Sequence, residues 1–256
     1  MTMADRKRAA RVTVENVSLR FPLYHAGARS LKKLALAAAT RRLGRDSGSR
    51  VVVEALKEIS IGIASGERIG LIGGNGAGKT SLLRAIAGIY EPASGVVKTC
   101  GSLNVLLDPN LGMNPDLTGR ENIFLRGLYH GLSRPALRRL EDDVASFAEL
   151  AEFLDLPLRI YSAGMSVRLG FALATAIQPQ ILLMDEWFLA GDAAFLEKAH
   201  TRLEDLVRGV EILVLATHQE PVVRKWCTRV ILLDQGRVRA DGPPGDVLDE
   251  YFLRSR

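Results

Sequence analysis

Cysteine is scarce in this sequence, since Cys100 and Cys227 are the only two among 256 residues. Two cysteines so far apart do not form a disulfide framework or a metal-binding spacing. A reducing, cytosolic compartment is therefore the simplest interpretation. Long apolar runs are lacking as well: the longest candidate, Leu169–Ile177, ends at Gln178-Pro179-Gln180, well short of the roughly 18 residues that a membrane span needs. The N-terminus carries positive charge without a following apolar segment, which predicts no signal peptide.

Charge is unevenly distributed along the chain. Residues 1–50 hold 12 Lys/Arg against 3 Asp/Glu, whereas the remainder holds 22 against 26. Such a basic segment suits nucleic acid, anionic lipid or an acidic partner, although charge alone favours a solvated face. Within it, residues 25–50 form a basic insertion that predicts a weakly amphipathic helix from Leu31 to about Gly44. A functional position, at a membrane surface or against a permease, and a plain surface helix are equally good expectations for that segment.

A glycine-rich turn, GGNGAGKT, fits the phosphate-loop pattern G-x-x-x-x-G-K-[ST] at every required position. It follows a short apolar run, Arg68–Ile72, and precedes apolar residues at helical spacing, which is the strand–turn–helix context the motif needs. The N–H groups of such a turn converge on an anion, and the helix dipole adds positive potential. We therefore predict a nucleoside-triphosphate site in which Lys79 reaches the outer phosphates and Thr80 ligates magnesium. The predicted contacts are Gly73, Gly74, Asn75, Gly76, Ala77, Gly78, Lys79, Thr80 and Ser81.

The segments around this turn alternate between strand-like and helix-like patterns. Apolar runs at Ile181–Met184, Ile212–Thr217 and Val230–Asp234 predict buried strands with helices between them, which indicates a parallel sheet covered on both faces. A capping box at Thr118–Glu121 opens a mostly helical insertion over about residues 111–178. Further strands are expected at Arg11–Phe21, Val51–Ala55 and Ile59–Ile63, and further helices from Ser133 to about Leu150 and from Met165 to Ile177.

Titratable residues follow the ends of two predicted buried strands. Asp185 and Glu186 come directly after Ile181–Met184, and His218 comes after Thr217. Because ligands of parallel α/β sheets bind at the carboxyl ends of the strands, we expect these residues near the phosphate loop. Asp185 would anchor magnesium, Glu186 would orient and deprotonate an attacking water, and His218 would contact the γ-phosphate. Lys79, Glu186 and His218 are thus the predicted catalytic residues.

Five motifs taken together resemble an ATP-binding cassette (ABC) ATPase: GGNGAGKT, YSAGM (161–165), ILLMDE (181–186), AGD (190–192) and ATH (216–218). The resemblance covers nearly the whole chain. It implies a single cassette over residues 1–256, with a P-loop NTPase (RecA-like) α/β fold: a mostly parallel sheet core, an antiparallel β subdomain and an inserted α-helical subdomain. It also implies that ATP and Mg²⁺ are bound and that two copies sandwich two nucleotides. Ser162, Gly164 and Met165 would then meet the ATP of the second copy, and Asp192 would lie at the dimer interface.

A narrower resemblance concerns exporters of O-antigen and related cell-surface polysaccharides. It rests on SLRFPLY (18–24), the basic insertion, LLDPNLGMNPDLTGRENIFLRG (106–127) and LLMDEWFLAGD (182–192). It implies a homodimer on the cytoplasmic face of the inner membrane, two permease subunits as partners, lipid-linked polysaccharide as cargo and no nucleic acid. The expected permease contacts are residues 111–116 and the adjoining helical insertion. The alternatives are the ATPase of another exporter or importer, a nucleic-acid machine and a catalytically inactive binding protein.

Some positions depart from the usual ABC pattern. Asp108 stands where most transporter cassettes have a glutamine that touches magnesium, so we assign Asp108 to the metal shell. In YSAGM (161–165), the stretch that is similar to the family's signature sequence, Ala163 and Met165 replace the usual second glycine and the glutamine. For stacking on adenine we assign Phe21, at the end of the first predicted strand, with Tyr24 as the alternative.

Overall fold

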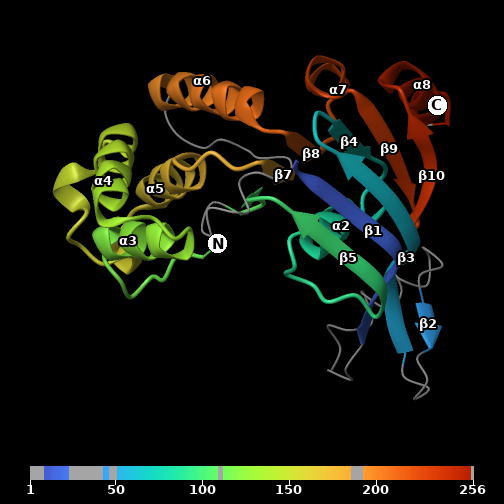
Figure 1. The fold of residues 1–256 in the computed structure, drawn as a ribbon, viewed down its shortest axis with the longest axis horizontal. Coiled ribbons are helices and arrows are strands. Elements are labelled where there is room, and N and C mark those ends of the chain that lie inside the picture. Colours follow the sequence, from blue (N-terminus) through green and yellow to red (C-terminus); the bar gives the residue numbers. More distant parts are fainter. Residues whose placement is uncertain (1–8, 23–42, 46–50, 109–111, 186–192, 255–256) are drawn as a thin grey trace. The chain divides into compact units, whose positions relative to one another are not determined.

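The computed structural model describes residues 9–22, 43–45, 51–108, 112–185 and 193–254. These residues divide into two compact units. The phosphate-loop unit comprises residues 9–101, 183–185 and 211–254, and the helical unit comprises residues 102–182 and 193–210. Each unit is described by itself below (Figure 1).

An antiparallel sheet forms one layer of the phosphate-loop unit, with strand order β2-β3-β1-β5. Its strands are β1 (Arg11–Pro22), β2 (Leu43–Arg45), β3 (Val51–Ala64) and β5 (Ser94–Cys100). The alternation of Val12 and Val14 with polar neighbours buries one face of β1, as predicted. Both β3 and β5 flank β1 in antiparallel register.

The structure joins the two strands predicted at Val51–Ala55 and Ile59–Ile63 into the single strand β3. Glu58, between them, has a left-handed φ of 51°, and its N–H donates to the Ser18 hydroxyl at 3.1 Å. Asn16 on β1 has the same left-handed φ, and the β1–β3 register shifts on either side of Val17. Irregularities of this kind let a ladder continue through residues that break the alternation.

The second sheet carries strands in the order β10-β9-β4-β8-β7 within this unit. Strand β4 pairs in parallel with both β8 and β9, while β10 folds back on β9 as an antiparallel hairpin. These strands are β4 (Arg68–Ile72), β7 (Ile181–Asp185, of which residues 183–185 belong here), β8 (Ile212–Ala216), β9 (Arg229–Asp234) and β10 (Arg237–Gly242). All five residues of β8 are buried, which explains its unbroken apolar sequence and confirms the predicted parallel sheet.

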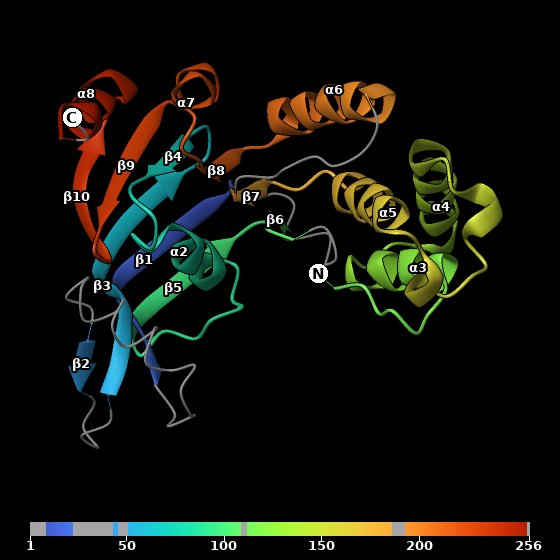
Figure 2. The same cartoon turned by 180° about the vertical axis from the view of Figure 1, so that it is seen from behind.

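Among its described residues, the phosphate-loop unit has the helices α2 (Lys79–Ile86), α7 (Glu220–Trp226) and α8 (Pro244–Arg254). Helix α2 follows β4 through the glycine-rich turn and contacts strands of both sheets (Figure 2). Helix α7 packs closely on β4 at Gly70. A Cβ added at Gly70 would lie 3.2 Å from the Cys227 sulfur and 3.3 Å from Val223. Cys227 is buried there, and desolvation raises the pKa of its thiol to about 12.

The helical unit is built on α3, α4 and α5, which pack on one another in both views (Figures 1 and 2). Its elements are β6 (Leu103–Leu106), α3 (Gly119–Tyr129), α4 (Arg134–Ala148), the 3₁₀ turns η2 (Ala151–Phe153) and η3 (Leu158–Ile160), α5 (Ala163–Thr175) and α6 (Ala193–Gly209). Val144 and Leu169 are fully buried in its core, and Phe147, Phe171 and Phe195 form an aromatic cluster. None of the helices in the described ranges is long and apolar enough to cross a bilayer.

The local signals that predict these helices are present in the structure. Thr118 caps α3, its side chain accepting from the N–H of Glu121 while the Glu121 carboxylate accepts from the N–H of Thr118, so the capping box is confirmed. Ser133 precedes α4, with Pro135 in the first turn. The helix predicted in the basic insertion falls largely outside the described residues, and its expected end near Gly44 is instead in β2, which pairs with Val51–Val53 of β3.

Candidate functional site

The phosphate loop joins the buried strand β4 to helix α2, as its sequence predicts. Gly73 and Gly78 have φ values of 141° and 117°, a region that residues with a Cβ rarely adopt. A Cβ at Gly73 would lie 2.2 Å from the Leu233 carbonyl oxygen, and one at Gly78 would lie 2.9 Å from that of Ala55. Both glycines are therefore required by backbone conformation and by close packing against neighbouring strands.

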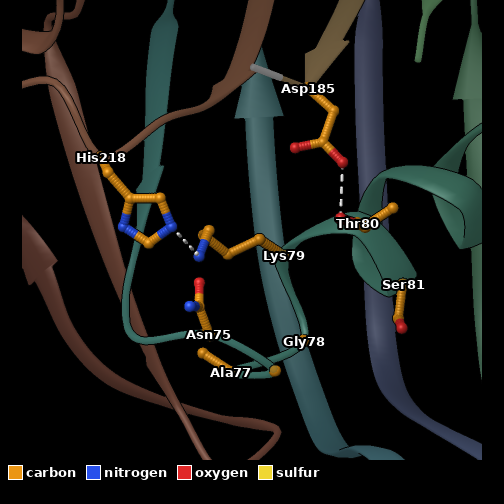
Figure 3. Close-up of a pocket in the computed structure, with 9 residues that line it drawn as sticks. Asn75, Ala77, Gly78, Lys79, Thr80, Ser81, Asp185 and His218 are labelled. Carbon is orange, nitrogen blue, oxygen red and sulfur yellow. Dashed lines mark hydrogen bonds between the residues drawn. The ribbon is translucent and has the colours of Figure 1, made fainter. Parts of the chain in front are cut away.

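A pocket of about 250 Å³ opens above this loop. It is lined by Asn75, Gly76, Ala77, Gly78, Lys79, Thr80, Ser81, Asp185 and His218 (Figure 3). The loop residues come from one turn, whereas Asp185 ends β7 and His218 follows β8. Because β7, β8 and β4 run side by side in one sheet, their carboxyl ends deliver these residues to one place. The predicted grouping of Asp185 and His218 with the loop is thus what the geometry shows.

Lys79 is held in place at the centre of this pocket. Its side chain is buried, and its Nζ donates to the carbonyl oxygens of Gly73 at 2.7 Å and Gly74 at 3.3 Å. The same atom lies 3.2 Å from Nε2 of His218 (Figure 3). A buried ammonium needs such partners, because an unpaired charge away from water is costly. The loop therefore holds a positive charge inside the pocket.

Thr80 and Asp185 provide the oxygen atoms of the site. The Thr80 hydroxyl donates to Oδ2 of Asp185 at 2.5 Å (Figure 3). A hydroxyl and a carboxylate are hard oxygen ligands of the kind Mg²⁺ prefers, so the residues present fit that ion. Within the described part of the chain, no three His, Cys, Asp or Glu side chains cluster as a metal site. Thr80 and Asp185 would hold a magnesium ion alongside the phosphate oxygens of a nucleotide.

The signature stretch begins helix α5 in the helical unit. Ser162 is the N-cap, and its hydroxyl accepts from the N–H of Met165 at 3.2 Å. Ser162 and Gly164 are exposed. A Cβ added at Gly164 would have only the Ser162 hydroxyl oxygen within 4 Å, at 3.9 Å. The start of α5 is therefore open to a ligand, with positive potential from the helix dipole.

Other predicted site residues lie elsewhere or outside the described ranges. Asp108 lies just beyond β6 in the helical unit and lines a small cavity there, and its metal contact stays a prediction. The ring of Phe21 meets that of Tyr90 edge to face, with centroids 5.1 Å apart, and Phe21 does not line the pocket. Adenine stacking by Phe21 therefore also stays a prediction. Glu186, Asp192 and Tyr24 fall outside the described residues, as do Trp187 and Phe188.

One supporting residue is missed by the sequence patterns. The N–H of Gly236, in the turn between β9 and β10, donates to the carbonyl oxygen of Ala77 at 2.9 Å. A Cβ at Gly236 would lie 2.7 Å from the Ala55 carbonyl oxygen, so the turn also packs closely on β3. The dipeptide Gln235-Gly236 after an apolar strand indicates a tight turn, but it carries no sign of what that turn touches.

Comparison with known proteins agrees with this geometry. The family model described as "ABC transporter" matches residues 56–189. The O-antigen export system ATP-binding protein RfbE of Yersinia enterocolitica is 42% identical over 225 residues, covering 88% of this chain and 94% of the relative. RfbB of Myxococcus xanthus, with the same description, is 41% identical over 207 residues, and the aligned part spans 81% of this chain but only 47% of that relative.

Among solved structures, the dimeric post-hydrolysis state of the ATP-binding cassette MJ0796, bound to ADP and Pi, superimposes with a TM-score of 0.65 at 22% identity. The match covers 91% of this chain and 98% of that one, and at this identity it shows the fold alone. The match to the family model and the Yersinia relative carry the family assignment, and the phosphate loop with Asp185 and His218 is the site expected of it. The chain therefore belongs to the ABC transporter family and is an ATPase cassette of that family.

Proposed function

We propose that this cassette hydrolyses ATP to drive export of a lipid-linked polysaccharide of the O-antigen type. The observation that carries the ATPase part is the assembled pocket, in which Lys79, the Thr80–Asp185 pair and His218 already face one another. The name of the Yersinia relative, whose length is almost entirely matched, supports the choice of cargo. The stretch TGREN (118–122) lies in the helical unit and is part of the resemblance to polysaccharide exporters, so it supports the same cargo.

Each described residue has a part in the proposed reaction. The loop N–H groups and the start of α2 bind the phosphates, and Lys79 neutralises charge that develops on the γ-phosphoryl group. Thr80 and Asp185 would hold Mg²⁺, which neutralises phosphate charge when bound. His218, placed 3.2 Å from the Lys79 Nζ, can donate to a γ-phosphate oxygen. Glu186, next in sequence to Asp185, is proposed as the base that orients and deprotonates water.

Two copies of the chain complete the proposed site. The exposed start of α5, with Ser162 and Gly164, offers N–H groups for the γ-phosphate of a nucleotide that the other copy binds. The dimeric state of the MJ0796 cassette supports this arrangement. ATP binding would close the dimer and hydrolysis would reopen it, with Asp192 proposed at the interface.

The proposed setting is the cytoplasmic face of the inner membrane, with two permease subunits as partners. The helices of the described residues do not themselves offer a membrane span, so the path for the polysaccharide would come from those subunits. Residues 111–116 and the adjoining helices of the helical unit are the proposed contact, and the basic insertion at residues 25–50 is proposed to face the membrane.

Glu186→Gln tests the proposal directly. The amide keeps the shape of the side chain but cannot accept a proton, so we expect ATP hydrolysis to fall by at least about 100-fold while ATP binding persists. The variant should also accumulate as an ATP-bound dimer, measured by sedimentation. In cells whose own gene is deleted, wild-type chain should restore surface polysaccharide and Glu186→Gln should not. Normal hydrolysis by the variant would contradict the role of Glu186, and normal surface polysaccharide without the gene would contradict the cargo.

A further inference from the structure

In the helical unit, backbone hydrogen bonds join the segment before α3 to the segment before α5. The N–H groups of Leu158 and Arg159 donate to the carbonyl oxygens of Leu117 and Pro115, at 3.0 and 2.9 Å. In the other direction, the N–H of Arg120 donates to the Leu154 carbonyl oxygen at 2.9 Å. We call this pair of segments, residues 114–120 and 153–161, the brace.

Side chains fix the brace from within. Asn122 is 4% exposed, and its Nδ2 donates to the carbonyl oxygens of Asn114 at 3.0 Å and Thr118 at 2.9 Å. Its Oδ1 accepts from the N–H of Asn114 at 2.8 Å. Arg120 pairs with Asp155 at 2.8 Å and also with Glu141 of α4. A buried amide with its donors and its acceptor all engaged holds one backbone conformation, because any other leaves it unsatisfied.

Tyr161 connects the brace to the signature stretch. Its ring is 9% exposed, and its hydroxyl donates to the carbonyl oxygen of Phe153 at 2.7 Å. Burial, followed by the charge of Asp155, raises the pKa of Tyr161, so the hydroxyl remains a donor at neutral pH. A Cβ at Gly119 would lie only 2.6 Å from this hydroxyl oxygen. The TGREN stretch, which contains Gly119, and the YSAGM stretch are therefore in direct contact.

Ser162, the next residue after Tyr161, begins α5 and caps it. We propose that Tyr161 is a positioning residue for ATP hydrolysis. Its contacts with Gly119 and with the Phe153 carbonyl oxygen hold Tyr161 in place. Tyr161 in turn places Ser162 and Gly164 so that they meet the γ-phosphate of the other copy's nucleotide. The brace thereby connects the described part of the proposed permease contact, residues 112–116, rigidly to the signature stretch. This inference rests on the proposed two-cassette site.

The test is a double-mutant cycle between Gly119→Ala and Tyr161→Phe in the full-length chain. Gly119→Ala places a methyl group against the hydroxyl and displaces Tyr161. Tyr161→Phe removes the atom that the methyl group meets most closely, while Leu154 Cδ2 and Cα remain 3.0 and 3.3 Å from that methyl position. With the Glu186→Gln substitution as background, we expect Gly119→Ala to raise the dissociation constant of the ATP-bound dimer about tenfold. Tyr161→Phe should raise it as well, because the bond to the Phe153 carbonyl oxygen is lost, and the double variant should lose less than the two single losses combined. ATP affinity of the monomer, set by the phosphate loop, should stay unchanged in all variants.

Matched controls separate positioning from general destabilisation. Tyr129 is 83% exposed, so Tyr129→Phe should leave dimer formation unchanged. A Cβ at Gly62 meets nothing within 4 Å, so Gly62→Ala is the control for adding a methyl group. Fully additive losses in the double variant, or a shift in melting temperature with unchanged dimer formation, would overturn the positioning role. An absence of ATP-dependent dimers in the background chain itself would instead overturn the two-cassette site, and the positioning role with it.

Discussion

The phosphate-loop unit and the helical unit position their functional residues in different ways. In the phosphate-loop unit, a contiguous run of residues 75–81 supplies most of the pocket, and parallel strands deliver Asp185 and His218 to the same edge. In the helical unit, the signature stretch depends on residues about 40 positions earlier in the chain, through Gly119 and Asn122. The first arrangement is a local conformation with few alternatives, and the second is a product of tertiary packing.

This difference decides where each unit is sensitive to change. The loop depends on glycine backbone conformations and on close contacts with β9 and β3, so a single methyl group at the wrong position should disturb it. The helical unit depends on caps, ion pairs and buried polar contacts, each of which contributes a modest amount. The comparison can be tested by changes that act on one unit at a time.

The largest effect is expected in the phosphate loop. Gly73→Ala forces a φ of 141° on a residue with a Cβ and places that atom 2.2 Å from the Leu233 carbonyl oxygen. We expect a loss of about 2–3 kcal/mol in the free energy of unfolding, measured by urea titration with circular dichroism. Gly74→Ala is the control, because its Cβ meets nothing within 4 Å, and it should stay within about 0.5 kcal/mol of the parent. Equal losses at both positions would refute the claim that local geometry sets the sensitivity of the loop.

A smaller effect is expected at the helix caps of the helical unit. Thr118→Ala removes one half of the capping box of α3 and should cost about 1 kcal/mol of stability. Ser133 also stands at an N-cap, but its side chain makes no capping hydrogen bond. Ser133→Ala should therefore change the free energy of unfolding by only a few tenths of a kcal/mol. A larger loss of stability at Ser133 than at Thr118 would contradict the expectation that Thr118, with its capping hydrogen bond, is the stronger cap.

The smallest effect is a pH dependence of the helical unit. Burial, followed by the charge of Arg126, lowers the pKa of His130 in the folded chain below its ordinary value. The unfolded chain then binds more protons below about pH 6.5, so stability is complete above that pH and falls as the pH decreases through it. His130→Gln should reduce the stability difference between pH 8 and pH 5.5 in urea titrations. His200→Gln, at an exposed residue of α6, should leave that difference in place, and equal effects of both substitutions would contradict this assignment.

The sequence predicts best those features that depend on short-range geometry. The GGNGAGKT turn, the capping box at Thr118 and the buried strand ending at Asp185 all have signals within a few residues, and all are found as predicted. The joining of β3 across Glu58 is missed, because a bulge depends on the partner strand and on the Ser18 hydroxyl. The supporting contact of Gly236 with Ala77, and that of Gly119 with Tyr161, are missed for the same reason. No periodicity in the sequence records which distant backbone approaches a glycine.

The burial of Cys227 has a practical consequence for studying the cassette. Reaction with alkylating reagents requires the thiolate, and a pKa of about 12 together with burial leaves almost none of it accessible at neutral pH. The sulfur lies against Gly70, three residues before the phosphate loop begins. Labelling of Cys227 therefore requires its sulfur to become exposed, for example by separation of α7 from β4. The sequence thus contains a thiol that reports exposure of the face of β4 that α7 covers.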